Sequence, residues 1–393
     1  MVAALVAIGP FTIDTYLPAM PIMANEFGVS IEQINFTIIT YMIGYGIAQL
    51  IGGPLSDQIG RKKVAYFGLG VYIPCSLLVT VSDSVLTVQL LRAVQAFGGG
   101  FATVICMAMI RDSYEPDEAA RRFPIVMMIM LIAPLVAPTI GILLLGFGWK
   151  SIFIFLALYG VIMLWFIFLI PETAPDLTHK IHLKGFLDQY QEVITRRVEG
   201  KLIPVRYILA LSLSSGCLIV FISNVSFLYI INYELDEKLF PIFFGLNILT
   251  MMFFNAVTAR LIKTISPYRI FRTGLIGQLL FLMVLVTVAT LTTPGVWLLT
   301  ALLSLTIGMT GLISPSVTAL YMAHYERLAG SASSVLSVSV FMLGAVLALL
   351  SQLFYNDTVR PIVYTMFFGV ILSNVIATTI PKPIPVATKT APV

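Results

Sequence analysis

The sequence predicts an all-α integral membrane protein with twelve transmembrane helices in two six-helix bundles. Three observations lead to this prediction: a very apolar composition, twelve separate apolar stretches, and a strong asymmetry in the positions of Lys and Arg. Hydrophobic residues make up 59% of the 393 residues and charged residues only 11%, whereas soluble domains carry about 25% charged residues. Because so few charges could not cover a water-facing surface, we expect a multi-pass protein in a lipid bilayer.

Twelve apolar stretches have about the length of ~20 residues that a helix needs to cross a bilayer. Each stretch is apolar throughout, whereas the strands of a membrane β-barrel alternate between apolar and polar residues over about ten positions. We therefore expect helices rather than strands. They run approximately over residues 3–24, 34–55, 64–81, 85–109, 123–147, 150–171, 204–231, 239–259, 273–292, 296–322, 333–354 and 361–380.

The Lys and Arg residues favour one orientation of these helices. If the N-terminus is cytoplasmic, 19 of the 23 basic residues fall in inside loops and tails. Only Lys150, Lys238 and Arg360 fall outside, and Arg92 lies within a span. Because cytoplasmic loops carry the excess of basic residues, we expect both termini in the cytoplasm. A missed or extra span would destroy this asymmetry, so the count of twelve is supported as well.

The longest polar segment separates six apolar stretches from six. It predicts an N-terminal six-helix bundle over residues 1–171, a cytoplasmic linker over 172–203, a C-terminal six-helix bundle over 204–381 and a cytoplasmic tail over 382–393. The basic loop after the second stretch has a counterpart after the eighth, as a duplication of two six-helix halves would produce.

Asp14 alone among the 19 acidic residues lies near the middle of a predicted span. An ionised carboxylate there costs at least ~2.5–3.5 kcal/mol, so the side chain should face a cavity or a partner. Because burial disfavours the charged form, such a carboxyl can take up and release a proton near neutral pH. A structural role stays open, since Pro10, Pro18 and Pro21 could break the helix and leave Asp14 to cap it, or Asp14 could hydrogen-bond to a neighbouring span.

Arg92 is the one basic residue within a predicted span. With a single acid and a single base buried in the membrane, we expect Arg92 to influence Asp14 and to take part in gating or proton coupling. The alternative is a static ion pair that only stabilises helix packing.

Two further patterns predict conformational change. The first inside loop has glycines at both ends and an acid beside three cations, which predicts a switch formed by Gly53, Asp57, Gly60 and Arg61. The fifth span carries Pro134, Pro138 and Gly141, which permit bending and close helix approach.

Aromatic, methionine and asparagine side chains within the spans are candidates for a substrate pocket, because such side chains suit a surface that adapts to several ligands. Helix packing or lipid contact is the alternative for each of them. The candidates are Tyr16, Tyr41, Tyr45, Met127, Met130, Asn224, Phe227, Tyr229 and Asn247.

Several other classes of protein are disfavoured. The three cysteines stand singly in apolar runs, so no metal site or cofactor is expected. The basic residues are dispersed without an aromatic platform, so nucleic acid is not an expected partner. A membrane-embedded enzyme would need clustered nucleophiles, bases or metal ligands within the spans, and a sensor would carry a soluble signalling domain.

Four segments resemble sequence motifs of the major facilitator superfamily. Residues 53–63 (Gly-Pro-Leu-Ser-Asp-Gln-Ile-Gly-Arg-Lys-Lys) are similar to its signature loop, with Gln58 in place of a basic residue. Residues 92–96 are similar to its Arg-x-x-Gln-Gly motif, residues 137–142 to its antiporter motif, and Pro171-Glu172-Thr173 to the usual end of its sixth span. In the second and third motifs Ala96, Ala137 and Ile142 stand where the superfamily has glycine.

Finer details resemble the Bcr/CflA group of drug:proton antiporters, namely residues 13–21, 40–44, 110–112 and 329–334. The resemblance implies proton-coupled efflux of small drug-like compounds at the bacterial inner membrane. We expect a monomer in the lipid bilayer, with a drug-like substrate and protons as its partners. It also implies that Asp14 takes part in proton coupling and that Arg92 assists it. Export of a metabolite or an amino acid on the same fold is the alternative.

Overall fold

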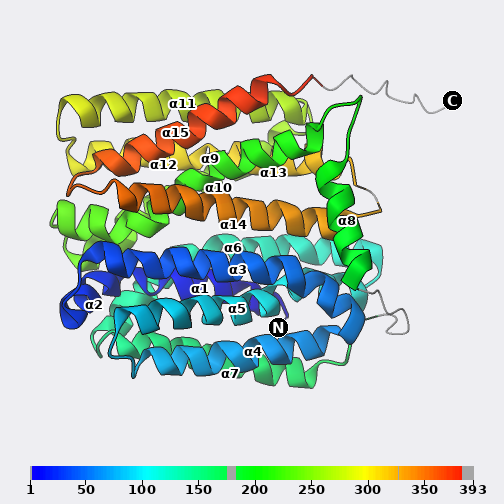
Figure 1. Cartoon of the computed structure of the whole chain (residues 1–393), viewed down its shortest axis with the longest axis horizontal. Helices are drawn as coiled ribbons and strands as arrows, with labels where there is room; N and C mark the ends of the chain where they lie inside the picture. Colours follow the sequence, from blue (N-terminus) through cyan, green and yellow to red (C-terminus); the bar gives the residue numbers. More distant parts are fainter. Residues whose placement is uncertain (1, 175–182, 326, 383–393) are drawn as a thin grey trace.

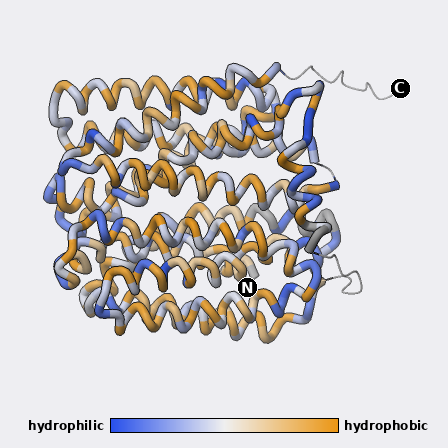
Figure 2. The backbone as a smooth tube through the Cα atoms, viewed as in Figure 1, coloured by the Kyte–Doolittle hydropathy of each residue, from blue (hydrophilic) through white to orange (hydrophobic). Residues whose placement is uncertain are grey.

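The structure, a computed structural model, describes residues 2–174, 183–325 and 327–382. Within these residues, twelve helices are long and apolar enough to cross a membrane, which confirms the predicted fold class. Figure 1 shows the spans running alongside one another, with one shorter helix across an end of the bundle. Hydrophilic residues gather at the helix ends and in the connecting segments (Figure 2).

The first six spans use η1 (Val2–Ala7), α1 (Ile8–Asp14), η2 (Leu17–Ala19) and α2 (Met20–Phe27), which together form one span, followed by α3 (Ile31–Ile59), α4 (Arg61–Val79), α5 (Val85–Ser113), α6 (Pro116–Leu145) and α7 (Lys150–Leu169). The transverse helix is α8 (Leu183–Thr195). The last six spans use α9 (Ile203–Ser226) with the π-helix η3 (Phe227–Asn232), η4 (Glu237–Leu239) with α10 (Phe240–Leu261), α11 (Pro267–Leu291), α12 (Val296–Gly308) with α13 (Thr310–Met322), α14 (Ala329–Leu353) and α15 (Arg360–Thr378).

The first span differs from the continuous helix that its apolar run predicts. Regular α-helix ends at Asp14, and a short 3₁₀ segment begins at Leu17. Pro18 explains the position of the break, because proline lacks an N–H and its ring clashes with the carbonyl four residues earlier. That carbonyl belongs to Asp14, so the proline interrupts the helix at the residue that carries the buried carboxyl.

The two sets of six spans meet mainly along two helix pairs, with smaller contacts of α9 on α3 and on the first span. One pair is α3 with α14 and the other is α6 with α10. In the first pair the side chains of Tyr45 and Phe341 contact each other edge to face, with ring centroids 5.0 Å apart. In the second, a Cβ atom on Gly245 would lie 3.1 Å from a methyl group of Leu135. Any relative movement of the two halves must change these contacts.

Candidate functional site

The Asp14 carboxyl is buried at the break in the first span. The residue is only 3% exposed. The oxygen Oδ1 accepts no hydrogen bond from any described residue, and no cation of the described chain lies within ion-pair distance of Asp14. A buried carboxyl is normally stabilised by donors or by a cation, so the structural alternative, a carboxylate that caps the broken helix, is not observed at Oδ1.

Close backbone packing positions this turn. The backbone of Thr15, the residue after Asp14, lies against Gly141 of α6, where a Cβ atom would collide with the Thr15 carbonyl oxygen. Glycine is required at position 141 for this approach. The span that carries Pro134 and Pro138 therefore contacts the Asp14 turn directly, as the sequence pattern of small residues suggested in general terms.

Arg92 of α5 is fully buried, and its guanidinium lies against aromatic rings. The guanidinium carbon is 4.9 Å from the ring centroid of Tyr16, 4.6 Å from that of Tyr41 and 5.8 Å from that of Phe153. A cation over an aromatic face gains roughly 2 kcal/mol when both groups are removed from water. These three rings thus stabilise the buried charge without a carboxylate.

Hydrogen bonds fix one edge of the same guanidinium. Arg92 Nη1 donates to Gln95 Oε1 at 2.8 Å, and Gln95 Nε2 donates to Ser76 Oγ at 2.7 Å. Nε and Nη2 of Arg92 donate to no residue in the described ranges. The static Arg92–Asp14 ion pair, which was the alternative interpretation of these two residues, is therefore absent from the described chain.

The other predicted pocket residues fall into separate groups. Tyr16 and Tyr41 surround Arg92, and Tyr45 stacks on Tyr41 with ring centroids 6.1 Å apart. In the other half, Asn224 is engaged within the protein, since it donates to Ser351 Oγ at 3.0 Å and accepts from Gln352 Nε2 at 2.7 Å.

The remaining candidates lie away from Arg92. Phe227 packs edge to face on Tyr355, with centroids 4.7 Å apart. Tyr229 and Asn247 are buried, and the Tyr229 hydroxyl lies near the side chains of Asn247 and Thr300. Met127 and Met130 of α6 are 41% and 43% exposed. A role in substrate binding stays a prediction for all of these residues.

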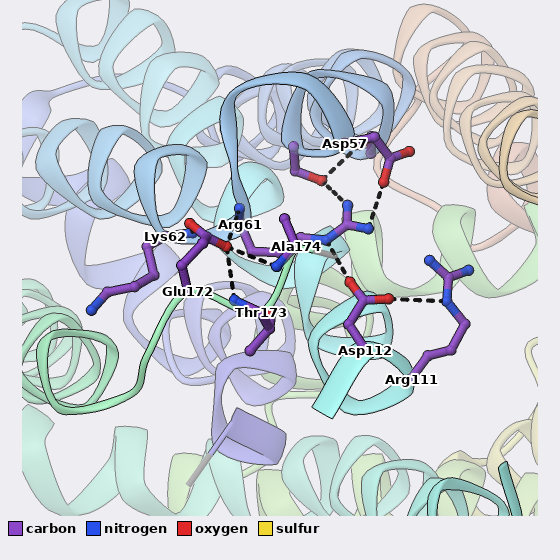
Figure 3. A network of polar contacts seen from close by, with 10 residues as sticks. Asp57, Arg61, Lys62, Arg111, Asp112, Glu172, Thr173 and Ala174 are labelled. Atoms are coloured by element: carbon purple, nitrogen blue, oxygen red, sulfur yellow. Dashed lines mark hydrogen bonds and ion pairs between the residues drawn. The ribbon is translucent and has the colours of Figure 1, made fainter. Parts of the chain in front are cut away.

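The predicted switch loop forms a dense polar network where α3 ends and α4 begins (Figure 3). The Arg61 side chain is buried and contacts three groups. Its Nη2 pairs with Asp57 Oδ1 at 2.5 Å, its Nε with Asp112 Oδ2 at 3.0 Å, and its Nη1 donates to Ser56 Oγ at 2.5 Å. Asp57 thus pairs with Arg61, and Asp112 of α5 joins the pair, while the role of this loop as a switch stays a prediction.

Glu172, just beyond α7, caps the first turn of α4. Its carboxylate accepts hydrogen bonds from the backbone N–H groups of Arg61 at 2.9 Å and Lys62 at 3.1 Å, and from those of Thr173 and Ala174. Partial burial raises the pKa of this carboxyl, but the four backbone donors together outweigh burial, so the pKa of Glu172 lies below its ordinary value.

Gly60 gives the chain room for this cap. Its φ angle of 101° lies in a region that favours glycine, and a Cβ atom there would lie 2.6 Å from Glu172 Oε2. The glycine spacing of the loop thus has two physical causes, a backbone conformation and the space that the capping carboxylate occupies.

The transverse helix α8 binds both halves of the protein. Tyr190 donates its hydroxyl proton to the carbonyl of Leu50 in α3 at 2.5 Å. Ser331 of α14 donates to Gln189 Oε1 at 2.8 Å, and Tyr325 donates to the carbonyl of Val193 at 2.7 Å. This helix therefore connects the ends of α3 and α14 at the face of the bundle on which it lies (Figure 1).

The family model described as Major Facilitator Superfamily matches residues 2–349. The chain belongs to this superfamily. A protein of Haemophilus influenzae named "Bicyclomycin resistance protein homolog" is 30% identical over 371 residues, which cover 93% of this chain and 91% of that protein. A "Multidrug resistance protein MdtL" of Escherichia coli is 31% identical over 174 residues, 44% of each chain.

Solved structures of the superfamily share the fold. A D-xylose–proton symporter superposes with a TM-score of 0.73 at 13% identity, covering 97% of both chains. The POT family transporter PepTSo superposes with a TM-score of 0.74 at 14% identity, covering 96% of both chains. The family model confirms the superfamily that the sequence motifs implied, and these structures confirm the fold.

Sequence reasoning did not find two groups that the structure places in these sites. Phe153 of α7 faces Arg92, but it is one of 26 phenylalanines and stands in no distinctive pattern. Glu172 stood within a recognised motif, yet its role as a cap depends on the meeting of α4 and the end of α7, which lie more than 100 residues apart. Neither contact leaves a local signal in the sequence.

We predict that Glu172→Gln weakens the junction between α4 and the end of α7. The carboxylate gains about 0.3–1 kcal/mol at a helix N-terminus, so the unfolding temperature at pH 7 should fall by about 1–2 °C. The pKa of Glu172 is lower in the folded than in the unfolded protein, so its stabilisation is full above the unfolded value of about 4.3 and is lost as the pH falls through the folded value.

Thermal unfolding of the purified protein, followed by intrinsic fluorescence at several pH values, measures this effect. Glu234→Gln, at an exposed position outside the network, is the matched control. Equal unfolding temperatures for the two variants at pH 7 would contradict the proposed cap.

Proposed function

We propose that this chain is a proton-coupled antiporter that exports small, apolar or weakly polar drug-like compounds by alternating access. The observation that carries the proposal is the Asp14 carboxyl, buried at a helix break with one oxygen that accepts no hydrogen bond from the described residues. Relatives named for bicyclomycin resistance and multidrug resistance support efflux of drugs as the direction and substrate class.

The proton would be carried by Asp14. Protonation removes the free-energy cost of a buried negative charge, and deprotonation restores that cost unless water reaches the site from one side. Substrate either competes with the proton directly or prefers the conformation of the deprotonated protein. In both cases exchange results, because a ligand shifts a conformational equilibrium only through different affinities for its two states.

Arg92 would assist proton coupling at Asp14 through the electric field of its fixed positive charge. Tyr16 lies two residues after Asp14 in the chain and covers the guanidinium, so a movement of the broken helix changes the surroundings of both groups. The two unused donors of Arg92 can also bind an acceptor group of a substrate.

Alternating access would require two bundles that move relative to each other, residues 1–171 and residues 204–381. The linker 172–203 would join them and the tail 382–393 would follow the second bundle. Residues 175–182 of the linker and 383–393 of the tail lie outside the described structure. The contacts of α3 with α14 and of α8 with both halves would close one face of the protein. Bending of α6 at Pro134 and Pro138 would move the Asp14 turn through the contact between Gly141 and Thr15.

We further propose that the protein works as a monomer in the bacterial inner membrane with both termini in the cytoplasm. The bias of basic residues supports this orientation. It places the Arg61 network and α8 on the cytoplasmic side.

The orientation predicts which positions are accessible from outside the cell. Single cysteines are introduced at Asp236 and Asp188 after replacement of Cys75, Cys106 and Cys217. An impermeant thiol reagent added to whole cells should label the cysteine at 236 and leave the one at 188 unlabelled until the cells are opened. The reverse pattern would overturn the topology.

The role of Arg92 predicts a change in the pH dependence of transport. Arg92→Ala should remain in the membrane but shift the pH profile of export in proteoliposomes. Arg92→Lys should retain part of the activity, because lysine keeps the charge but loses the planar donor fork that stacks on the rings. Unchanged profiles in both variants would leave Arg92 as a packing residue.

The role of Asp14 predicts that Asp14→Asn abolishes coupling without preventing insertion. Asparagine resembles the protonated carboxyl in shape and cannot titrate, so drug resistance and drug-induced proton release from purified protein should both be lost. Asp14→Glu should keep partial activity with an altered pH dependence, and Asp83→Asn, at an exposed acid between α4 and α5, should behave as wild type.

A susceptibility panel in an efflux-deficient host, followed by transport in proteoliposomes under an imposed pH gradient, measures these effects. If Asp14→Asn still exports a drug uphill on a pH gradient alone, the proton is carried elsewhere. If no drug but a metabolite or an amino acid is exported, the fold serves the alternative substrate class.

A further inference from the structure

A groove lies on the surface of the bundle at the end opposite α8, between the end of α14 and the start of α15. It has a volume of about 690 Å³ and is lined by Leu350, Phe354, Asn356, Arg360, Tyr364 and Phe368, among others. None of these residues belongs to the sites around Asp14 or Arg61.

The polar end of the groove carries a positive charge that is held in place. Arg360 donates from Nε to the carbonyl of Ala289 at 3.0 Å and from Nη2 to that of Thr290 at 3.4 Å, at the C-terminal end of α11. Within the described chain its Nη1 donates to no acceptor and no carboxylate forms an ion pair with it. The two carbonyls contribute only partial charges, so a net positive charge remains at the mouth of the groove.

The acid nearest to Arg360 in the sequence acts on a different group. Tyr355 lies just beyond α14, and burial together with the Asp357 carboxylate raises its pKa. Asp357 is thus directed towards Tyr355, whose ring packs on Phe227. The charge of Arg360 is left for a ligand from outside the chain.

The rest of the groove is apolar and runs along the span. Phe354 is 70% exposed and Phe368 is 53% exposed, so large aromatic surfaces face outward on both sides. Phe368 follows Arg360 by eight residues of one helix, which places it about 12 Å deeper in the membrane. The groove therefore combines a cation at the membrane surface with an apolar wall that extends into the hydrocarbon layer.

We propose that this groove binds one anionic phospholipid, with the headgroup phosphate on Arg360 and an acyl chain along Phe354 and Phe368. A free inorganic anion would leave the apolar wall unused, and a hydrocarbon chain alone would not use the fixed guanidinium. An amphiphile with an anionic head satisfies both parts, and a bilayer supplies it at this depth. The proposal does not depend on the transported substrate or on proton coupling.

The test uses the full-length protein, purified in mild detergent, delipidated and titrated with phosphatidylglycerol under native mass spectrometry. Arg360→Gln should weaken binding of the first lipid by about ten-fold, the effect of one lost charge-assisted contact. Phe354→Ala should weaken it as well, because it removes one apolar wall at an exposed position. Lys238→Gln, which removes another of the three basic residues predicted on this face, is the matched control and should bind as wild type.

Three results would overturn the proposal. Equal lipid binding by wild type and Arg360→Gln would show that the groove is not the site. Displacement by millimolar inorganic phosphate, with no effect of Phe354→Ala, would identify an anion site without a lipid. A dimer that replaces the lipid-bound monomer and disappears in both variants would assign the groove to a second copy of the chain.

Discussion

Arg92 places a positive charge in the interior of a membrane-spanning bundle, where it is buried from bulk solvent and pairs with no carboxylate of the described residues. Its guanidinium is instead stacked among Tyr16, Tyr41 and Phe153 and fixed at one edge by Gln95. Guanidinium is weakly hydrated and planar, so it tolerates this environment better than an ammonium group. Because aromatic faces satisfy the cation, the Asp14 carboxyl is not needed as its counterion.

This separation has a consequence for coupling. A carboxylate locked in a buried ion pair resists protonation, because protonation would leave the cation unpaired at high cost. A carboxyl outside such a pair can change its protonation state while the cation stays in place. The helix break at Asp14, which Pro18 produces, also lets the backbone around Asp14 change conformation. An interrupted helix can adjust locally without unfolding the rest of the span.

The sequence predicted those features that depend on a local pattern of residues along the chain. Span count follows from apolar length and from the charge bias, and Asp14, Arg92 and the 53–63 loop stand out because polar residues are rare in apolar runs. The contacts between distant segments could not be predicted in the same way. Phe153 facing Arg92, Glu172 capping α4 and Asn224 held by Ser351 and Gln352 depend on which helices pack together. For the same reason, the rarity of buried charges suggested that Asp14 and Arg92 act on each other, but it could not show that no ion pair joins them.

The network at the start of α4 shows how one end of the bundle can be both stable and ready to change. The Asp112 side chain is 5% exposed and the Arg61 side chain 3% exposed, whereas that of Asp57 is 52% exposed. Breaking the buried pair would leave charges without partners, which is costly, whereas an ion pair with a half-exposed carboxylate contributes roughly 0–1 kcal/mol. Arg61, Asp112 and the Glu172 cap therefore form the fixed part of the network. Asp57 is the group whose separation from Arg61 costs the least free energy. Asp57 lies on α3, the helix that packs on α14 and is bound by Tyr190 of α8. Its exposed ion pair can therefore rearrange beside the contacts that a separation of these helices would have to break.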